Sequence, residues 1–189
     1  IKEILVGSNN QGKIKEIKDL LPKYCRILVP NDFNLKSPKE TGKTFISNSR
    51  LKVNFFSKFV NFPVIADDSG LCIKSLNNRP GIHSARFAKR PGGFSKAMKI
   101  LLKKMKNKKN RTAFFVCCLS FKFPGKKIIT VQGKIKGTIA KKISGKKGFG
   151  YDPIFIPQGL KKTFGQISPK KKYKIDHRYK AFKKIKKFL

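Results

Sequence analysis

The stretch that decides the fold runs from Val64 to Leu71 and reads VIADDSGL. Its first three residues are apolar and follow a proline, a pattern typical of a short buried strand. Two adjacent carboxylates come next, and Asp-Ser-Gly predicts a turn at the strand's end, where α/β proteins usually place their chemistry. Carboxylate oxygens are the ligands that Mg²⁺ prefers, although an ordinary turn explains the pair equally well. The choice between a magnesium-binding pair and an ordinary turn therefore depends on the neighbouring segments.

The bulk composition predicts a globular protein with a real core. The chain has 189 residues, 39% of them hydrophobic, including 17 Phe. This size predicts one domain or two closely joined lobes. We expect a soluble, cytoplasmic protein without a membrane partner, because no run of 18 apolar residues and no early apolar block occurs. The four cysteines lack metal-like spacing, which favours reduced core thiols in a reducing compartment.

The net charge of +37 has two possible explanations. A nucleic-acid or anionic-membrane surface would need such a charge. However, only 7 of the 46 cationic residues are Arg, the residue whose fork binds phosphate and guanine. Lysines spread along the whole chain beside many Phe, Ile and Asn, as an A/T-rich coding sequence would produce. We therefore expect no specific nucleic-acid partner, although the field attracts anions such as nucleoside triphosphates.

The N-terminal segment predicts a phosphate-binding loop. Residues 3–6 form a short apolar strand, residues 7–13 read GSNNQGK, and apolar residues then recur at helical spacing as far as Pro22. A strand, a glycine-bearing loop and a helix present backbone N–H groups to a phosphate, and Lys13 adds an ammonium. The spelling matches the P-loop, but Ile14 replaces its magnesium-binding hydroxyl. Another phosphate cradle or a plain turn stays open.

The rest of the chain alternates strand and helix patterns. Apolar runs predict strands at residues 26–30, 112–123, 128–131 and 154–156, and apolar residues at helical spacing predict helices at 44–60, 94–105 and 177–189. A strand resumes at 71–73, and residues 76–88 are expected to be irregular. The loop GFGYDP, residues 148–153, offers Phe149 and Tyr151 for stacking on a base, or forms a hairpin-like turn with core aromatics. His177 and Arg178 open the last helix with donors suited to a carbonyl or phosphate oxygen.

Six of these segments, in this order, resemble the inosine triphosphatase family, the Ham1/RdgB-type pyrophosphatases of non-canonical purine nucleoside triphosphates. The matching segments are SNNQGK at 8–13, ETGKTF at 40–45, ADDSGL at 66–71, PGIHSAR at 80–86, GFGYDPIF at 148–155 and His177-Arg178. Each is weak alone, but the shared order over nearly the whole chain is specific, and GFGYDP is the most telling.

The resemblance implies an α/β fold and an activity. The fold would be a single domain over residues 1–189, with an elongated, twisted mixed sheet, flanking helices, and two lobes around a central cleft. The activity would be hydrolysis of dITP, ITP and XTP to the monophosphate and pyrophosphate with Mg²⁺, which keeps these nucleotides out of DNA and RNA. A homodimer is typical of the family.

The resemblance also implies roles for particular residues. The triphosphate would be held by the loop Ser8, Asn9, Asn10, Gln11, Gly12 and Lys13. Asp68 would bind Mg²⁺ together with Glu40 and act as the base for water. The remaining substrate contacts would be Ser69, then Phe149, Gly150, Tyr151 and Asp152 around base and sugar, and Lys172, His177 and Arg178 at the purine's oxygen edge. Cationic donors favour a 6-oxo base over adenine, whose 6-amino group is itself a donor.

Four positions depart from the family pattern. Ser47 replaces a usual Glu, Lys39 a common acid, Gln166 a frequent Glu and Asp176 a frequent Ser. Losing acids near the metal predicts weaker magnesium binding or activity. Two rival functions stay open: a Maf-like pyrimidine triphosphate pyrophosphatase of similar architecture, and a catalytically weakened relative that binds nucleic acid.

Overall fold

The computed structural model describes all 189 residues, and the chain divides into two compact units. The first unit contains Ile1–Asp68, Cys117–Gly133 and Arg178–Leu189, and the second contains Ser69–Val116 and Lys134–His177. Each unit is therefore assembled from segments that lie far apart in the sequence.

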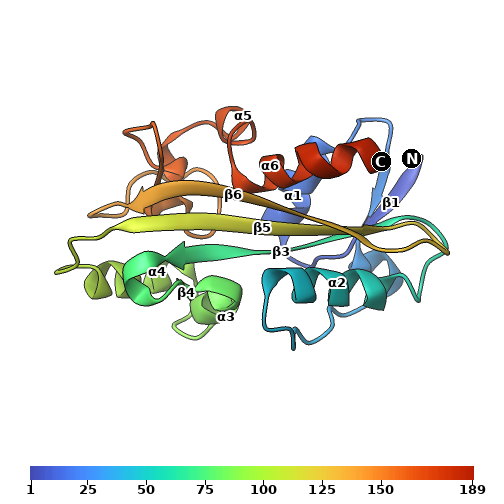
Figure 1. Cartoon of the computed structure of the whole chain (residues 1–189), viewed down its shortest axis with the longest axis horizontal. Helices are drawn as coiled ribbons and strands as arrows, with labels where there is room; N and C mark the ends of the chain where they lie inside the picture. The colour runs from blue at the N-terminus through green and yellow to red at the C-terminus, as the bar shows by residue number, and fades with distance from the viewer. The chain divides into compact units, whose positions relative to one another are not determined.

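A mixed sheet of seven strands runs through the chain (Figure 1). The strands are β1 (Glu3–Val6), β2 (Arg26–Leu28), β3 (Val64–Ile73), β4 (Arg79–Pro80), β5 (Thr112–Lys122), β6 (Ile129–Ile139) and β7 (Phe155–Pro157). Their order is β2-β1-β3-β5-β6-β7, with β4 paired to β3. Strand β1 pairs in parallel with β2 and β3, whereas the pairs β3–β4 and β6–β7 are antiparallel. The predicted α/β class with a mixed sheet is confirmed.

Six helices accompany the sheet. They are α1 (Gln11–Leu20), α2 (Phe45–Phe56), α3 (Ser84–Lys89), α4 (Phe94–Lys104), α5 (Pro169–Lys172) and α6 (His177–Ile185). The predicted helices at 44–60, 94–105 and 177–189 correspond to α2, α4 and α6, and the side chain of Thr44 caps α2. Helix α3 begins within the segment 76–88 that was expected to be irregular, so that expectation was wrong.

In the first unit, strand alternation sorts the core onto two faces of the sheet. Ile4, Val6 and Ile65 pack with α1 and α6, whereas Leu5, Val64 and Ala66 pack with α2. Figure 1 shows α1 and α6 on one side of these strands and α2 on the other. Successive side chains of a strand point to opposite faces, so Asp67 and Asp68, which follow Ala66, also lie on opposite faces of the sheet.

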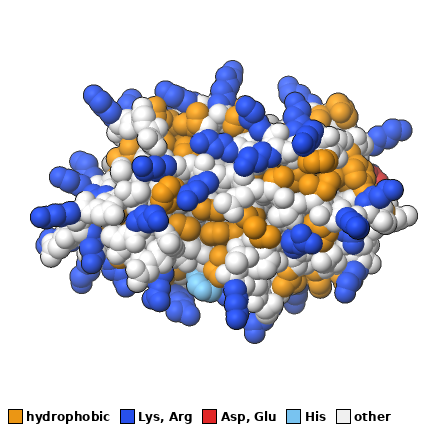
Figure 2. All heavy atoms as spheres, in the orientation of Figure 1, with side chains coloured by type: hydrophobic (Ala, Val, Ile, Leu, Met, Phe, Trp, Pro, Cys, Tyr) orange, Lys and Arg blue, Asp and Glu red, His pale blue; other side chains and the backbone are white.

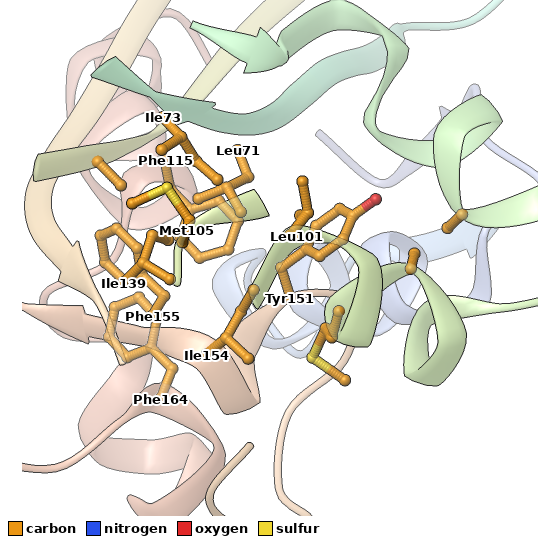
Figure 3. Packing of buried hydrophobic residues seen from close by; sticks show 14 of the residues in the cluster. Leu71, Ile73, Leu101, Met105, Phe115, Ile139, Tyr151, Ile154, Phe155 and Phe164 are labelled. Carbon is orange, nitrogen blue, oxygen red and sulfur yellow. The ribbon is translucent and has the colours of Figure 1, made fainter. Parts of the chain in front are cut away.

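The second unit has an aromatic core of its own. Phe155 lies between Phe115 and Phe164, with ring centroids 4.6 Å and 5.4 Å away (Figure 3). Leu71 and Ile73 of β3 and Leu101 and Met105 from the α4 segment belong to the same cluster. Strand β3 thus contributes to the cores of both units.

The predicted turn at Asp-Ser-Gly was wrong, because β3 continues without a break from Val64 to Ile73. Gly70 explains why a strand can run through this sequence. A Cβ atom there would lie 2.2 Å from the carbonyl oxygen of Gly81 and 2.5 Å from Ser84 Oγ. The Ser84 hydroxyl also accepts the N–H of Leu71 at 2.9 Å. Glycine here permits close approach of a neighbouring turn rather than a turn of its own.

Lysine side chains cover the visible face of the molecule (Figure 2). Blue cationic side chains project from all over this face, and acidic ones are nearly absent from it. The structure contains no helix both long and apolar enough to span a bilayer.

All four cysteines are free and buried, which predicts that they are unreactive in the folded protein. Burial raises the pKa of Cys72 to about 11 and that of Cys118 to about 12, so neither is ionised near neutral pH. Because the thiolate is the reactive form, Ellman's reagent at about pH 8 should modify no thiol rapidly in the native chain. In guanidinium chloride it should modify all four. One fast equivalent in the folded protein would contradict the packing described here.

Candidate active site

The predicted phosphate cradle forms a tight turn between β1 and α1. The Gly7 N–H donates to Ile65 O at 2.8 Å, which fastens the loop to β3. Asn10 caps α1 by accepting the N–H of Lys13 at 3.2 Å, and its own N–H donates to Ser8 Oγ at 3.2 Å. Lys13 lies in the first turn of the helix, as predicted. The loop therefore offers a helix N-terminus and an ammonium group to an anion.

The remaining residues of the loop differ in exposure. Asn9 and Gln11 are exposed, and Gly12 is half-buried. Gly7 permits the loop's close packing, because a Cβ atom there would lie 2.6 Å from the ring of Phe56. The loop therefore exposes the side chains of Asn9 and Gln11 to solvent, while its backbone at Gly7 packs against the core.

Asp67 and Asp68 point to opposite faces of β3. Both are buried within the strand. Asp67 lies on the same face of the strand as Ile65 and interacts with residues of α1 and α6. Asp68 lies on the same face as Ala66 and interacts with a residue of α2. The two adjacent carboxylates therefore do not act as one paired ligand, and each has its own partners.

Asp67 is the anionic centre of a buried ion cluster. Its Oδ2 lies 3.3 Å from Lys13 Nζ and 2.9 Å from Arg178 Nη2. The other guanidinium nitrogen of Arg178 forms an ion pair with Glu16 on α1. Arg178 is only 1% exposed. The cluster joins β3, α1 and α6, so it fixes the position of the Lys13 ammonium.

Asp68 is held by a single neutral donor. Asn48 Nδ2 donates to Asp68 Oδ2 at 3.0 Å, and Asn48 Oδ1 accepts the N–H of Gly42 at 2.8 Å. Asn48 is fully buried on α2. It therefore links the strand that carries Asp68 to the loop that carries Glu40, and it leaves the second oxygen of Asp68 for another partner.

Lys52 places a positive charge among the carboxylates on this face. It is 5% exposed, and its Nζ lies 2.8 Å from Glu40 Oε1. Burial acts to lower the pKa of Lys52, but Asp67, Asp68 and Glu40 together raise it above its usual value. Lys52 is therefore a buried ammonium that remains charged.

The two neighbouring aspartates have pKa values shifted in opposite directions. Burial raises the pKa of Asp68 above its usual value, although Lys52 and Lys13 act against this. Burial would also raise the pKa of Asp67, but Lys13, Arg178 and Lys52 together hold it well below its usual range. Carboxylates whose environments separate their pKa values in this way take different roles. Asp67 is a permanent anion, and Asp68 is the better proton acceptor.

The residues around Asp68 suit magnesium only when a substrate supplies further oxygens. No group of three His, Cys, Asp or Glu residues is arranged to hold a metal. Magnesium, however, is commonly bound through one or two carboxylates, with phosphate and water oxygens completing its coordination. Asp68 and Glu40 are hard oxygen donors connected through Lys52 and Asn48, and this donor set fits that mode.

Ser47, which replaces the family's usual acid, has a structural role. Its Oγ accepts the N–H of Thr44 at 3.0 Å, and its own N–H donates to Thr44 Oγ1 at 3.0 Å. This reciprocal pair caps α2, the helix that carries Asn48 and Lys52. The weaker magnesium binding expected from the loss of this acid stays a prediction.

In the second unit, residues 148–153 form a turn closed by Asp152. Asp152 Oδ2 accepts the N–H of Phe149 at 2.9 Å. Gly148 has φ +71°, and a Cβ atom there would lie 2.0 Å from the same oxygen. Tyr151 is buried and donates its hydroxyl to Ser84 O at 2.8 Å, while its ring meets Phe94 edge to face. Phe149 and Gly150 are half-buried at the tip of this turn.

Lys172 and Asp152 form a buried ion pair. Lys172 Nζ lies 2.6 Å from Asp152 Oδ2 and 5.0 Å from the centre of the Phe149 ring. Both charged residues are 1% exposed. His177 is also buried, and its ring stacks on Phe115 at 4.9 Å. Ser69, the first residue of this unit, is half-buried on β3. The structure thus brings Phe149, Asp152 and Lys172 together, and the substrate contacts expected of these residues stay predictions.

Sequence reasoning missed Glu16, Asn48 and Lys52. The scarcity of acids was an available signal for Glu16. Only nine acids occur in the chain, and Glu16, Glu40, Asp67 and Asp68 all belong to the ion clusters of the first unit. Lys52 carried no such signal, because it is one lysine among many.

A buried lysine-and-carboxylate site beside a loop-to-helix turn defines this chain as an α/β protein suited to bind a phosphate-bearing substrate. Comparison with known proteins is more specific. The Ham1 family model matches residues 4–188, and the chain belongs to this family.

Curated relatives and solved structures agree with this assignment. A protein of Bacillus subtilis named dITP/XTP pyrophosphatase is 40% identical over 200 residues, covering 100% of this chain and 98% of the relative. One from Staphylococcus aureus with the same name is 42% identical over 193 residues, covering 100% and 97%. The structure of the Staphylococcus aureus Ham1 protein superposes with a TM-score of 0.87 at 39% identity, and that of a HAM1 protein from Coxiella burnetii with 0.89 at 30%. Each comparison covers 100% of this chain and 98% of the solved chain.

Proposed function

We propose that this protein is a nucleoside triphosphate pyrophosphatase that hydrolyses dITP and XTP to the monophosphate and pyrophosphate. The observation that carries the proposal is Asp68. It is a buried carboxylate of raised pKa on the same strand as the aspartate that binds Lys13. The full-length likeness to proteins named dITP/XTP pyrophosphatase supports the same activity.

In this proposal the first unit binds the phosphates and activates water. Lys13 and the N–H groups at the start of α1 bind phosphate oxygens. Asp68 accepts the proton of the attacking water through the oxygen that Asn48 does not occupy. Lys52 stabilises negative charge that develops beside it. Asp67, held permanently ionised, keeps the Lys13 ammonium in place.

Magnesium is the proposed cofactor, and Asp68 and Glu40 are its proposed ligands. When bound, the metal would neutralise phosphate charge and lower the pKa of the attacking water. The Glu40–Lys52 ion pair gives Glu40 a partner in the absence of metal. We also propose a homodimer, as the family resemblance implies, and a cytoplasmic location, which the four free, buried cysteines support. Sedimentation velocity tests the first, and microscopy of a tagged chain tests the second.

A substrate panel tests the proposed specificity. Pyrophosphate release should be fastest with dITP and XTP and at least about tenfold slower with dGTP and dATP. The proposed donors Lys172, His177 and Arg178 match a 6-oxo group, which adenine lacks, and guanine must be excluded by its 2-amino group. Kinetic assays with Mg²⁺ and equal substrate concentrations measure the ratios of kcat/KM. Preference for UTP or dTTP would indicate the Maf-like activity instead. No turnover, together with tight duplex binding at physiological salt, would indicate a nucleic-acid-binding relative.

A further inference from the structure

A cavity that the proposed reaction does not use lies in the second unit. Its volume is about 730 Å³. Its walls come from the turn at Lys74–Leu76, strand β4, helix α3 and helix α4. Ligand-binding cavities commonly measure about 300–1,000 Å³, so this one is large enough for a drug-sized or nucleotide-sized molecule.

The polar side of the cavity is strongly cationic. Arg79, Arg86, Arg90 and Lys104 line it and are exposed to solvent. No acidic residue lines the cavity, and none of these four side chains takes part in the ion pairs of the structure. An anion entering here would therefore meet cations that are not already neutralised by a carboxylate.

The use of arginine separates this cavity from the general lysine coat. The chain has only 7 Arg among 46 cationic residues, and three of the seven line this single cavity. A composition bias towards lysine does not explain why arginine gathers here. Arginine differs from lysine in offering a planar fork that binds phosphate oxygens in pairs.

The other side of the cavity is apolar. Leu76, Pro80, Phe87 and Leu101 line it, and Leu101 belongs to the core of the unit. An inorganic ion would leave this apolar surface uncovered. A ligand with a flat, weakly polar body and a charged tail would cover both sides, because the body can lie against Phe87 and the leucines.

Hydrogen bonds at Ser84 fix the start of α3, which forms one wall of the cavity. Ser84 Oγ donates to Gly81 O at 2.7 Å and accepts the N–H of Leu71 at 2.9 Å, so the start of α3 is tied to β3. Tyr151 donates to the carbonyl oxygen of the same serine. A preformed wall lowers the entropic cost of binding, because less of the protein has to be ordered by the ligand.

We propose that this cavity binds a nucleoside phosphate at a site that does not hydrolyse it. The phosphates lie between Arg79, Arg86 and Arg90, and the base lies on the apolar side. Nothing in the lining provides a carboxylate to activate water.

Adenosine 5′-diphosphate is a suitable probe, because the proposed base selection disfavours adenine at the hydrolytic site. Isothermal titration calorimetry in metal-free buffer should show one binding event per chain. Arg86→Gln/Arg90→Gln should weaken it at least about tenfold, since two charge-assisted phosphate contacts are lost. The matched control, Lys89→Gln/Lys99→Gln, removes two exposed cations that do not line the cavity, one from α3 and one from α4, and should change the affinity less than about twofold.

Further measurements distinguish this cavity from the hydrolytic site. Lys13→Ala should leave the binding of the diphosphate intact while abolishing pyrophosphate release from dITP. Uncharged adenosine and inorganic pyrophosphate should each bind more weakly than the complete nucleotide, because each covers only one side of the cavity. The proposal is wrong if the diphosphate does not bind, if Lys13→Ala removes its binding, or if both double variants weaken it equally. The pyrophosphatase assignment survives any of these results.

Discussion

Replacing Asp68 with asparagine is expected to lower kcat for dITP hydrolysis about 10³-fold, the scale of losing a positioned general base. Asparagine has nearly the same shape and can still accept the hydrogen bond from Asn48 Nδ2. It cannot take a proton from water, and it is a poorer ligand for magnesium than a carboxylate. Steady-state release of pyrophosphate with saturating dITP measures the change.

The same substitution should leave stability unchanged or raise it in metal-free buffer. Burial raises the pKa of Asp68, so its ionised form is less favourable in the folded chain than in the unfolded chain. A raised pKa contributes stability at low pH that is lost as the pH rises through the folded value. A neutral asparagine avoids that loss, so the activity should fall while the melting temperature stays the same or rises.

Asp19→Asn is the matched control, because Asp19 is an exposed acid on α1. It should keep both the activity and the melting temperature of the wild type. Retention of more than a tenth of the activity by Asp68→Asn would mean that another group activates the water. A large drop in its melting temperature would mean that the loss of activity reflects unfolding.

The sequence was sufficient to predict most elements but not the path of β3. Continuous apolar runs identified β1 and β5, and helical spacing identified α2 and α4. The local turn preferences of Ser69-Gly70 favoured a bend, but tertiary contacts keep these residues in an extended strand. The Cys72–Pro80 pairing with β4 and the close approach of Gly81 hold the chain extended there. The partners in these contacts lie 8 and 11 positions further along the chain, so the local turn signal at Ser69-Gly70 does not include them.

The candidate site was predictable as far as its motifs were local. Ser8 to Lys13 and the aspartate pair could be read from short segments, and Asn10 and Lys13 do open α1 as expected. The ion cluster could not be predicted this way. Arg178 is 111 residues from Asp67 and 162 from Glu16 in the sequence. A helix pattern shows which face of α6 is apolar, but not which buried carboxylates meet the arginine at its start.

Replacing Arg178 with glutamine is expected to destabilise the fold by about 3–5 kcal/mol, the cost of removing one partner from a buried ion pair. The guanidinium contacts Asp67 and Glu16, both of them buried. Glutamine reaches less far and has no charge, so Glu16 would lose its cationic partner and Asp67 would keep only its lysines. Urea unfolding followed by circular dichroism measures the difference without relying on activity.

Arg50→Gln is the control, since it makes the same substitution at an exposed position of α2. Exposed substitutions usually change stability by less than about 0.5 kcal/mol. Arg178→Lys should lie between the two, because lysine keeps the charge but cannot bridge two carboxylates with a planar fork. Equal stability of Arg178→Gln and Arg50→Gln would contradict the role given to the cluster.

The pH dependence of unfolding tests the same cluster from the acidic side. The cations hold the pKa of Asp67 well below its ordinary value of 3.8, so the unfolded chain binds the proton first as the pH falls. The stability that Asp67 contributes is therefore present above about pH 4 and is lost as the pH falls further.

Removing Arg178 brings the folded pKa of Asp67 closer to the unfolded one, so the variant should lose less stability than the wild type between about pH 5 and pH 3. The wild-type and variant curves should converge towards low pH. Parallel curves would show that Arg178 does not set the ionisation of Asp67.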